Sequence, residues 1–206
     1  IDGKTVTAIG DYAFSNCSVL TSINIPKKIT SIGSSAFSGC TNLSSVKFNY
    51  NDTVEYTASI GSSAFSGCTS LENVELSENI TSIGTYAFDG CSSLKNLSLP
   101  ESLTSVGFDM IRGTGITSIT IPKNVSESSH GYYNSDYNGA LAGCTTLKEV
   151  IFEEGMKSIP AYIMASKDYT SYVEKVVIPS TVTEIKERAF YNCKNMTIYG
   201  YANSYA

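Results

Sequence analysis

One phrase of apolar and small residues recurs along the chain. In its clearest copies, residues 9–26 and 83–100, it runs Ile-Gly-x-x-Ala-Phe-x-x-Cys-x-x-Leu-x-x-Ile-x-Ile-Pro. The position of the Ala recurs eight times, at spacings of 23, 28, 23, 23, 30, 23 and 26 residues. The positions are Ala13, Ala36, Ala64, Ala87, Met110, Ala140, Ile163 and Ala189. A fixed period of this kind predicts a stack of equivalent structural units.

Each copy predicts a short strand and a turn. The Leu-x-x-Ile-x-Ile part ends in an alternation of period two, which is typical of a strand with one buried face. A proline follows at Pro26, Pro100, Pro122 and Pro179, where it ends the strand. A glycine after the last aliphatic residue, as at Gly33 and Gly84, permits a tight turn. The Ala-Phe-x-x-Cys part is too short for an independent helix and predicts a helical turn or a 3₁₀ piece.

The period lies in the range of leucine-rich repeats and predicts an α/β right-handed solenoid. Short parallel strands would form its concave face, and helical turns or 3₁₀ pieces its convex face. We expect residues 1–206 to form one domain of about eight repeats of roughly 23 residues. Longer spacings place insertions near 49–58, 126–138 and 165–172. The first two follow a strand and should emerge on the same edge of the sheet, and the third should emerge on the opposite edge.

The repeated phrase resembles the BspA-like leucine-rich repeats of bacterial surface proteins, also called the Treponema pallidum type. Residues 196–206 resemble the segment that closes such arrays in gut bacteria. The resemblance implies an extracellular or cell-surface protein that adheres to host or microbial ligands. It carries over no catalytic residues and no fixed binding residues. The fifth and seventh copies depart from the pattern, because they lack both the Cys and the Ala-Phe pair.

Charge and hydropathy narrow the range of partners. The net charge is −5 and the basic residues are scattered, so nucleic acid is not an expected partner. No apolar run approaches the roughly 20 residues that cross a bilayer, so this segment should not insert into a membrane. The chain starts at Ile1 without Met, and we interpret it as a monomeric fragment of a larger parent protein.

The cysteines occupy equivalent positions in their repeats. They are Cys17, Cys40, Cys68, Cys91, Cys144 and Cys193. Stacked neighbours could come within disulfide reach, but their side chains would run side by side rather than face each other. The favoured interpretation is therefore a ladder of buried thiols that act as small apolar groups.

The sequence favours neither catalysis nor a cofactor. There is no Cys-x-x-Cys pair and one histidine, which excludes a zinc site of the usual spacing. A Ser-His-acid set could be written with His130 and Asp136, but both lie in a polar insertion that would not hold the geometry. We expect no enzyme activity, no metal and no cofactor.

Binding residues are expected on the outward side of the strands and in one insertion. The strand positions are Asn24, Lys47, Glu75, Ser98, Thr120, Ile151 and Val177. Among them Ile151 and Val177 are apolar and predicted exposed, as at contact sites. The insertion contributes Tyr132, Tyr133 and Tyr137 among Ser, Gly and Asn, a composition typical of recognition loops. An ordinary solvated sheet face and drift in exposed loops are the alternatives.

Two functions remain open. The chain is either an adhesion or ligand-binding module for a host or microbial surface protein or glycan, or a structural spacer. A spacer would project another domain of a larger surface protein from the cell.

Overall fold

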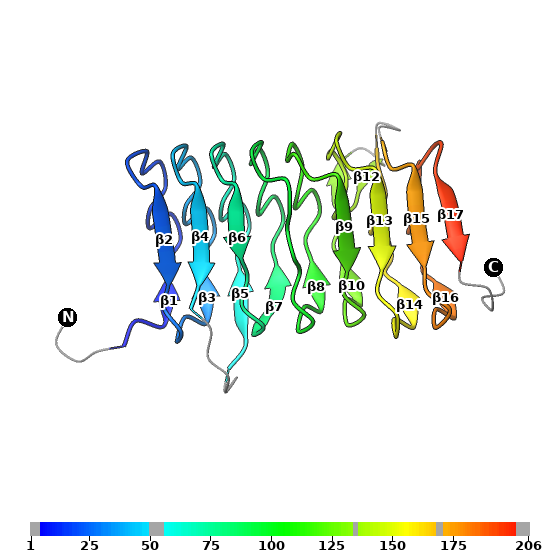
Figure 1. The fold of residues 1–206 in the computed structure, drawn as a ribbon, viewed down its shortest axis with the longest axis horizontal. Helices are drawn as coiled ribbons and strands as arrows, with labels where there is room; N and C mark the ends of the chain where they lie inside the picture. The colour runs from blue at the N-terminus through cyan, green and yellow to red at the C-terminus, as the bar shows by residue number, and fades with distance from the viewer. Residues whose placement is uncertain (1–4, 50–55, 134–135, 168–170, 201–206) are drawn as a thin grey trace.

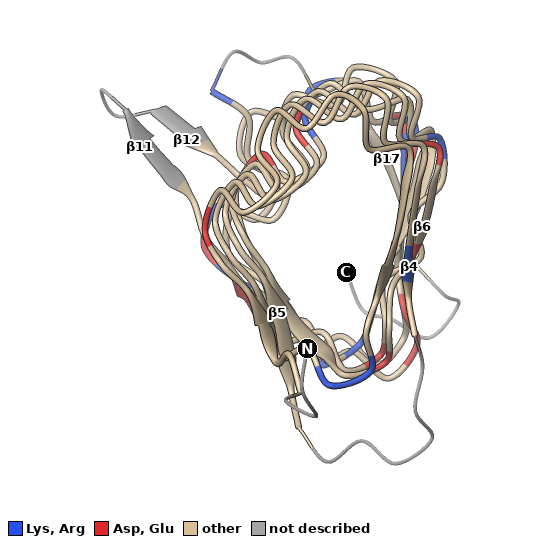
Figure 2. Cartoon of the chain, turned by 90° about the vertical axis from the view of Figure 1, so that its left-hand side faces the viewer, with Lys and Arg blue, Asp and Glu red and all other residues tan. Residues whose placement is uncertain are grey.

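The computed structural model describes residues 5–49, 56–133, 136–167 and 171–200. The repeats stack in a nearly straight row, with one turn of the chain per repeat (Figure 1). Viewed along the row, the cross-section has three sides (Figure 2). Two sides are walls of strands and the third is a wall of turns. The prediction of a parallel-strand solenoid is therefore confirmed.

The first wall, here named the strand face, contains the strands that the sequence predicts. They are β2 (Ser22–Ile25), β4 (Ser45–Phe48), β6 (Asn73–Glu75), β9 (Ser118–Ile121), β13 (Glu149–Phe152), β15 (Lys175–Ile178) and β17 (Thr197–Gly200). They form two parallel sheets, β2-β4-β6 and β9-β13-β15-β17. β2, β9 and β15 each end at the residue before a proline, as predicted.

The second wall is a further set of parallel strands that the sequence analysis did not predict. Its strands are β1 (Ala8–Ile9), β3 (Ser31–Ile32), β5 (Ala58–Ile60), β7 (Ile80–Ile83), β8 (Ser105–Val106), β10 (Glu127–Ser128), β14 (Ser158–Ile159) and β16 (Glu184–Ile185). The first six form one sheet, and β14 pairs with β16. The repeated glycine follows these strands. A Cβ on Gly84 would lie 2.6 Å from the backbone N of Ser62, so this glycine serves close approach between repeats rather than a tight turn.

The third wall is formed by the Ala-Phe-x-x-Cys segments and contains no helix, so the predicted helical or 3₁₀ convex side is wrong. The backbone amides of Tyr12, Phe14 and Asn16 donate to carbonyls of the next repeat instead of to their own turn. Both Tyr12 and Asn16 have left-handed backbone conformations, with φ of 57° and 60°. Left-handed residues interrupt a right-handed helix, so the wall becomes a second kind of inter-repeat ladder. In the described residues the protein is all β.

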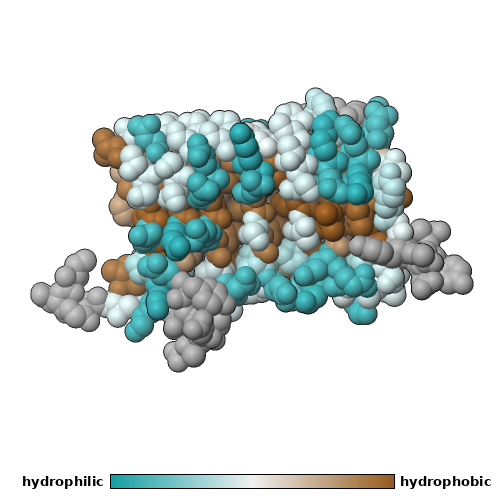
Figure 3. Space-filling model, viewed as in Figure 1, coloured by the Kyte–Doolittle hydropathy of each residue, from teal (hydrophilic) through white to brown (hydrophobic). Residues whose placement is uncertain are grey.

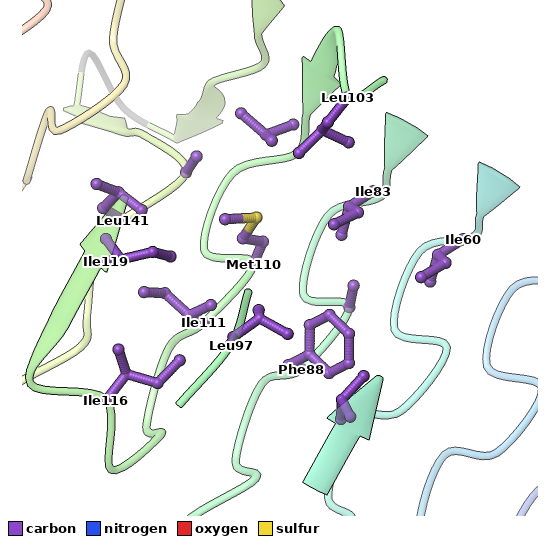
Figure 4. Close-up of a cluster of buried hydrophobic side chains, with 14 of the residues drawn as sticks. Ile60, Ile83, Phe88, Leu97, Leu103, Met110, Ile111, Ile116, Ile119 and Leu141 are labelled. Atoms are coloured by element: carbon purple, nitrogen blue, oxygen red, sulfur yellow. The ribbon is translucent and has the colours of Figure 1, made fainter. Parts of the chain in front are cut away.

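The core lies between the three walls and is filled by the repeated apolar positions. Phe14, Phe37, Phe65 and Phe88 stack face to face, with ring centroids 5.1–5.5 Å apart. From the fifth to the seventh repeat, aliphatic and Met side chains such as Met110 and Ile111 occupy these positions instead (Figure 4). This continuous core exists only because neighbouring repeats cover each other's apolar surfaces.

The insertions near 49–58 and 126–138 do not follow equivalent strands, although they were predicted to emerge on the same edge of one sheet. The first insertion falls between the end of β4 at Phe48 and the start of β5 at Ala58, and its residues 50–55 lie outside the described part. The chain after β9 first forms β10 and then the antiparallel hairpin of β11 (Gly131–Tyr133) and β12 (Asp136–Asn138). The prediction fails because the chain forms a second, unpredicted strand, β10, after β9 and before the hairpin.

Candidate functional site

The predicted binding positions form one stripe along the strand face. Asn24, Lys47 and Glu75 are direct neighbours across β2, β4 and β6. Further along, Thr120, Ile151 and Val177 are neighbours across β9, β13 and β15. All these side chains are exposed or half-buried, and Ser98 lies exposed between the two groups. The Lys47–Glu75 ion pair, at 2.9 Å, is mostly exposed and contributes little stability.

The C-terminal part of the stripe is hollowed into a shallow depression of about 540 Å³, here named the C-terminal basin. It is lined by Glu149, Ile151, Lys175, Val177, Tyr199 and Gly200. Hydrophobic atoms gather over β13 and β15, between hydrophilic side chains at both edges of the face (Figure 3). The predicted apolar pair is therefore joined by an aromatic side chain.

Tyr199 is not among the predicted binding residues, although it occupies the equivalent position of its repeat. It follows Ile198 as Asn24 follows Ile23, and it pairs with Val177 across β15 and β17. Because residues 196–206 resemble a closing segment, the predicted stripe ends at Val177. Tyr199 is 51% exposed, so about half of its surface is accessible to a ligand.

An ion pair borders the basin. Lys175 Nζ lies 2.7 Å from Glu149 Oε1 and 5.6 Å from the centre of the Tyr199 ring. The hydroxyl of Ser118 also donates to the Glu149 carboxylate. The hydrogen bond from Lys175 lowers the pKa of Glu149 and keeps it ionised. The basin thus combines an apolar floor, an aromatic ring, one cation and one anion.

A second depression, here named the central groove, interrupts the strand face. Its volume is about 340 Å³, and it is lined by residues 96–99 and 118–120 together with Glu101, Pro122 and Glu153. Residues 96–99 occupy the fourth strand position but form no strand, and this gap separates the two sheets of the strand face.

The repeat on the C-terminal side of the groove is one residue shorter. Gly113 and Ile116 are one residue closer in sequence than the equivalent Gly90 and Leu94 of the preceding repeat. Where Ser44 N–H bonds to Thr21 O in an ordinary pair of repeats, the shortened repeat forms a bond from Gly115 N–H to Leu94 O, at 2.9 Å. The backbone is therefore shifted in register as it enters the strand position, and the ladder does not form.

The tyrosine insertion is described only in its backbone. In the backbone register of the hairpin, Tyr132 pairs with Tyr137 and Tyr133 pairs with Asp136. Their side chains lie outside the described part of the structure. That these tyrosines bind a ligand together with the stripe stays a prediction.

The base of the hairpin is held by a buried acid. Asp109 is 1% exposed, and the side-chain amide of Asn138 donates to its Oδ2 at 3.0 Å. Its other oxygen, Oδ1, has no hydrogen-bond partner among the described residues. Burial raises the pKa of Asp109, against the opposing effects of Asn138 and Arg112.

The thiol ladder is confirmed. All six cysteines are free, and four of them are buried, with Cys17 and Cys193 half-buried near the two ends. The Cys40 thiol donates to the carbonyl of Phe14 in the preceding repeat, at 3.0 Å. Burial raises the pKa of Cys40 and of Cys193 to about 11, which keeps these thiols protonated and unreactive.

The described residues contain no group of three or more His, Cys, Asp or Glu side chains that could hold a metal ion. His130 stacks on the ring of Tyr162, with centroids 4.2 Å apart, and the Asp136 side chain lies outside the described part. Nor does the described chain contain a helical segment that could span a bilayer.

Comparison with known proteins identifies the repeat. Residues 7–138 and 129–197 match the family described as BspA type leucine rich repeat region. A leucine-rich-repeat protein of Treponema pallidum superposes with a TM-score of 0.62 at 25% identity, covering 96% of this chain and 74% of that protein. One from Bacteroides ovatus superposes with a TM-score of 0.55 at 25% identity, covering 93% of this chain and 57% of that protein. No curated protein sequence matches.

Proposed function

The chain belongs to the BspA-type leucine-rich-repeat family, and we propose that it is a ligand-binding module of a bacterial cell-surface protein. The family resemblance of the repeated phrase supports the surface location. The exposed stripe supports binding, because a repeat array presents equivalent outward positions as one extended surface.

The observation that carries the proposal is the C-terminal basin. Elsewhere the predicted stripe positions are polar or charged, whereas Ile151, Val177 and Tyr199 bring apolar and aromatic surface together. Lys175 and Glu149 stand beside this surface as fixed polar groups. An apolar floor with a few oriented polar groups is the usual composition of a ligand site.

The chemistry suits a glycan or a protein side chain. A sugar ring could lie on the Tyr199 ring and direct its hydroxyls to the Lys175 ammonium and the Glu149 carboxylate. An aromatic or aliphatic side chain of a protein could occupy the same floor. Both belong to the host and microbial surface ligands that we propose for this module.

The test is a binding screen of the chain against arrayed glycans and host matrix proteins. We expect a saturable ligand whose binding Tyr199→Ala reduces by at least about tenfold, while Tyr12→Ala has no effect. Tyr12 is a matched control, because it is 65% exposed in the turn wall, away from the strand face. Replacing Tyr132, Tyr133 and Tyr137 together tests the hairpin separately. A folded protein that binds nothing would support the spacer function instead.

A further inference from the structure

We propose that the central groove receives an extended peptide of a partner protein, which adds a strand to the free edge of β9. This site is separate from the C-terminal basin and does not depend on the function proposed for it. Binding of an extended peptide to an open sheet edge relies on backbone hydrogen bonds, with side chains adding selectivity.

Unpaired backbone groups line the β9 side of the groove. The amide of Glu149 donates to Thr117 O, and that of Glu153 donates to Ile121 O. In a parallel ladder the residues between these acceptors alternate in direction, so the N–H and C=O groups of Ser118 and Thr120 point toward the groove. Neither residue forms a backbone hydrogen bond on that side in the described structure.

The opposite side of the groove is equally unpaired. Within the described chain, no backbone hydrogen bond involves residues 96–99. Asn96, Ser98, Ser118 and Thr120 are exposed, so water can reach the backbone groups on both sides of the groove in the free protein. A peptide backbone carries donors and acceptors at the spacing of a strand, and it can replace this water by pairing with the open edge of β9.

At the groove, the stack of repeats opens on one wall only. Behind the groove, β7 and β8 are paired, with Ser82 opposite Ser105 and Ile83 opposite Val106. In the turn wall, the amide of Phe88 donates to Met110 O at 2.8 Å. Two walls thus hold the fourth and fifth repeats together, while on the strand face residues 96–99 form no strand between β6 and β9 (Figure 1). The repeats therefore remain stacked behind the opening in the strand face.

The charges near the groove favour a peptide with a basic residue. Glu101 and Glu153 line the groove just beyond the ends of the strands, and Glu78 contacts the backbone amide of Glu101. One cation, Lys123, faces these acids: its Nζ lies 3.1 Å from Glu101, and its backbone amide donates to Glu153. The local balance is negative, so a Lys or Arg side chain at this end of the peptide would be attracted.

The experiment screens the chain against an array of random eight-residue peptides and then follows backbone exchange by NMR. We expect bound peptides to be enriched in Lys or Arg. A synthesised hit should slow the exchange of the Ser118 and Thr120 amides by about tenfold or more. N-methylation of alternate peptide amides should weaken binding by about tenfold, because it removes backbone donors.

Matched variants separate this site from other surfaces. Glu101→Gln with Glu153→Gln should weaken a basic hit, whereas Glu75→Gln on the same face should not. Tyr199→Ala should leave the peptide bound, because the C-terminal basin is not involved. Slow exchange of Ser118 and Thr120 in the free protein would overturn the proposal. The proposal would also be overturned by peptide hits that tolerate N-methylation, by a glycan that binds in the groove, or by an array without hits.

Discussion

Removing one ring from the phenylalanine stack tests the packing of the core. Phe37 is completely buried, and its ring lies parallel to those of Phe14 and Phe65, with centroids 5.1 and 5.2 Å away. Phe37→Ala opens a cavity in surroundings that are held in place by three ladders, so little collapse is expected. The expected loss in the free energy of unfolding is about 3–5 kcal/mol, at the level of a buried Phe→Ala change.

Phe14→Ala is the matched control. Phe14 is 37% exposed at the N-terminal end and has one stacked neighbour, so its truncation removes less buried surface. Urea unfolding followed by circular dichroism gives both free energies, and calorimetry should show Tm falling by roughly 6–20 °C for Phe37→Ala. Equal losses in the free energy of unfolding for the two variants, or a wild-type Tm for Phe37→Ala, would refute the stacked core. They would also refute the alignment of repeats that places Phe37 in it.

Three further perturbations test other parts of the fold. Gly84→Ala should lower the free energy of unfolding by about 1–3 kcal/mol, because the added Cβ would lie 2.6 Å from Ser62 N. Gly10→Ala is the control and should not lower it, because a Cβ on Gly10 has nothing within 4 Å. Equal melting curves for the two variants would exclude close approach at Gly84. Asp109 has a raised pKa in the folded protein, so its contribution to stability falls as pH rises from the unfolded pKa through the folded one. Asp109→Asn should be more stable than wild type at neutral pH and should lack this slope in pH-dependent melts. The thiols of Cys40 and Cys193, with pKa values of about 11, should react with a disulfide reagent at pH 8 on the order of a hundredfold more slowly than free cysteine; unfolding in guanidinium chloride should restore the rate.

The repeated apolar positions predicted the parts of the fold that depend on periodicity. Alternation at Ile23 and Ile25 predicts β2, and Pro26 predicts its end. The equivalent cysteines predict the thiol ladder. The second wall escaped prediction because a strand such as β3, two residues long, is too short to show a period.

Local conformation explains the remaining differences. The turn wall depends on left-handed backbone at non-glycine residues such as Tyr12 and Ser35, which sequence patterns do not announce. The shifted register between the fourth and fifth repeats depends on the single residue missing before Ile116, a change whose effect appears only when repeats are stacked. The stripe was predicted up to Val177, and Tyr199 continues it by the same rule.

The binding isotherm of a screened glycan or matrix protein, measured side by side for the wild type, Tyr199→Ala and Tyr12→Ala, tests the central claim most directly. The proposal predicts saturable binding that falls by at least about tenfold in Tyr199→Ala and is unchanged in Tyr12→Ala. Equal isotherms for all three folded proteins would contradict a binding site in the C-terminal basin.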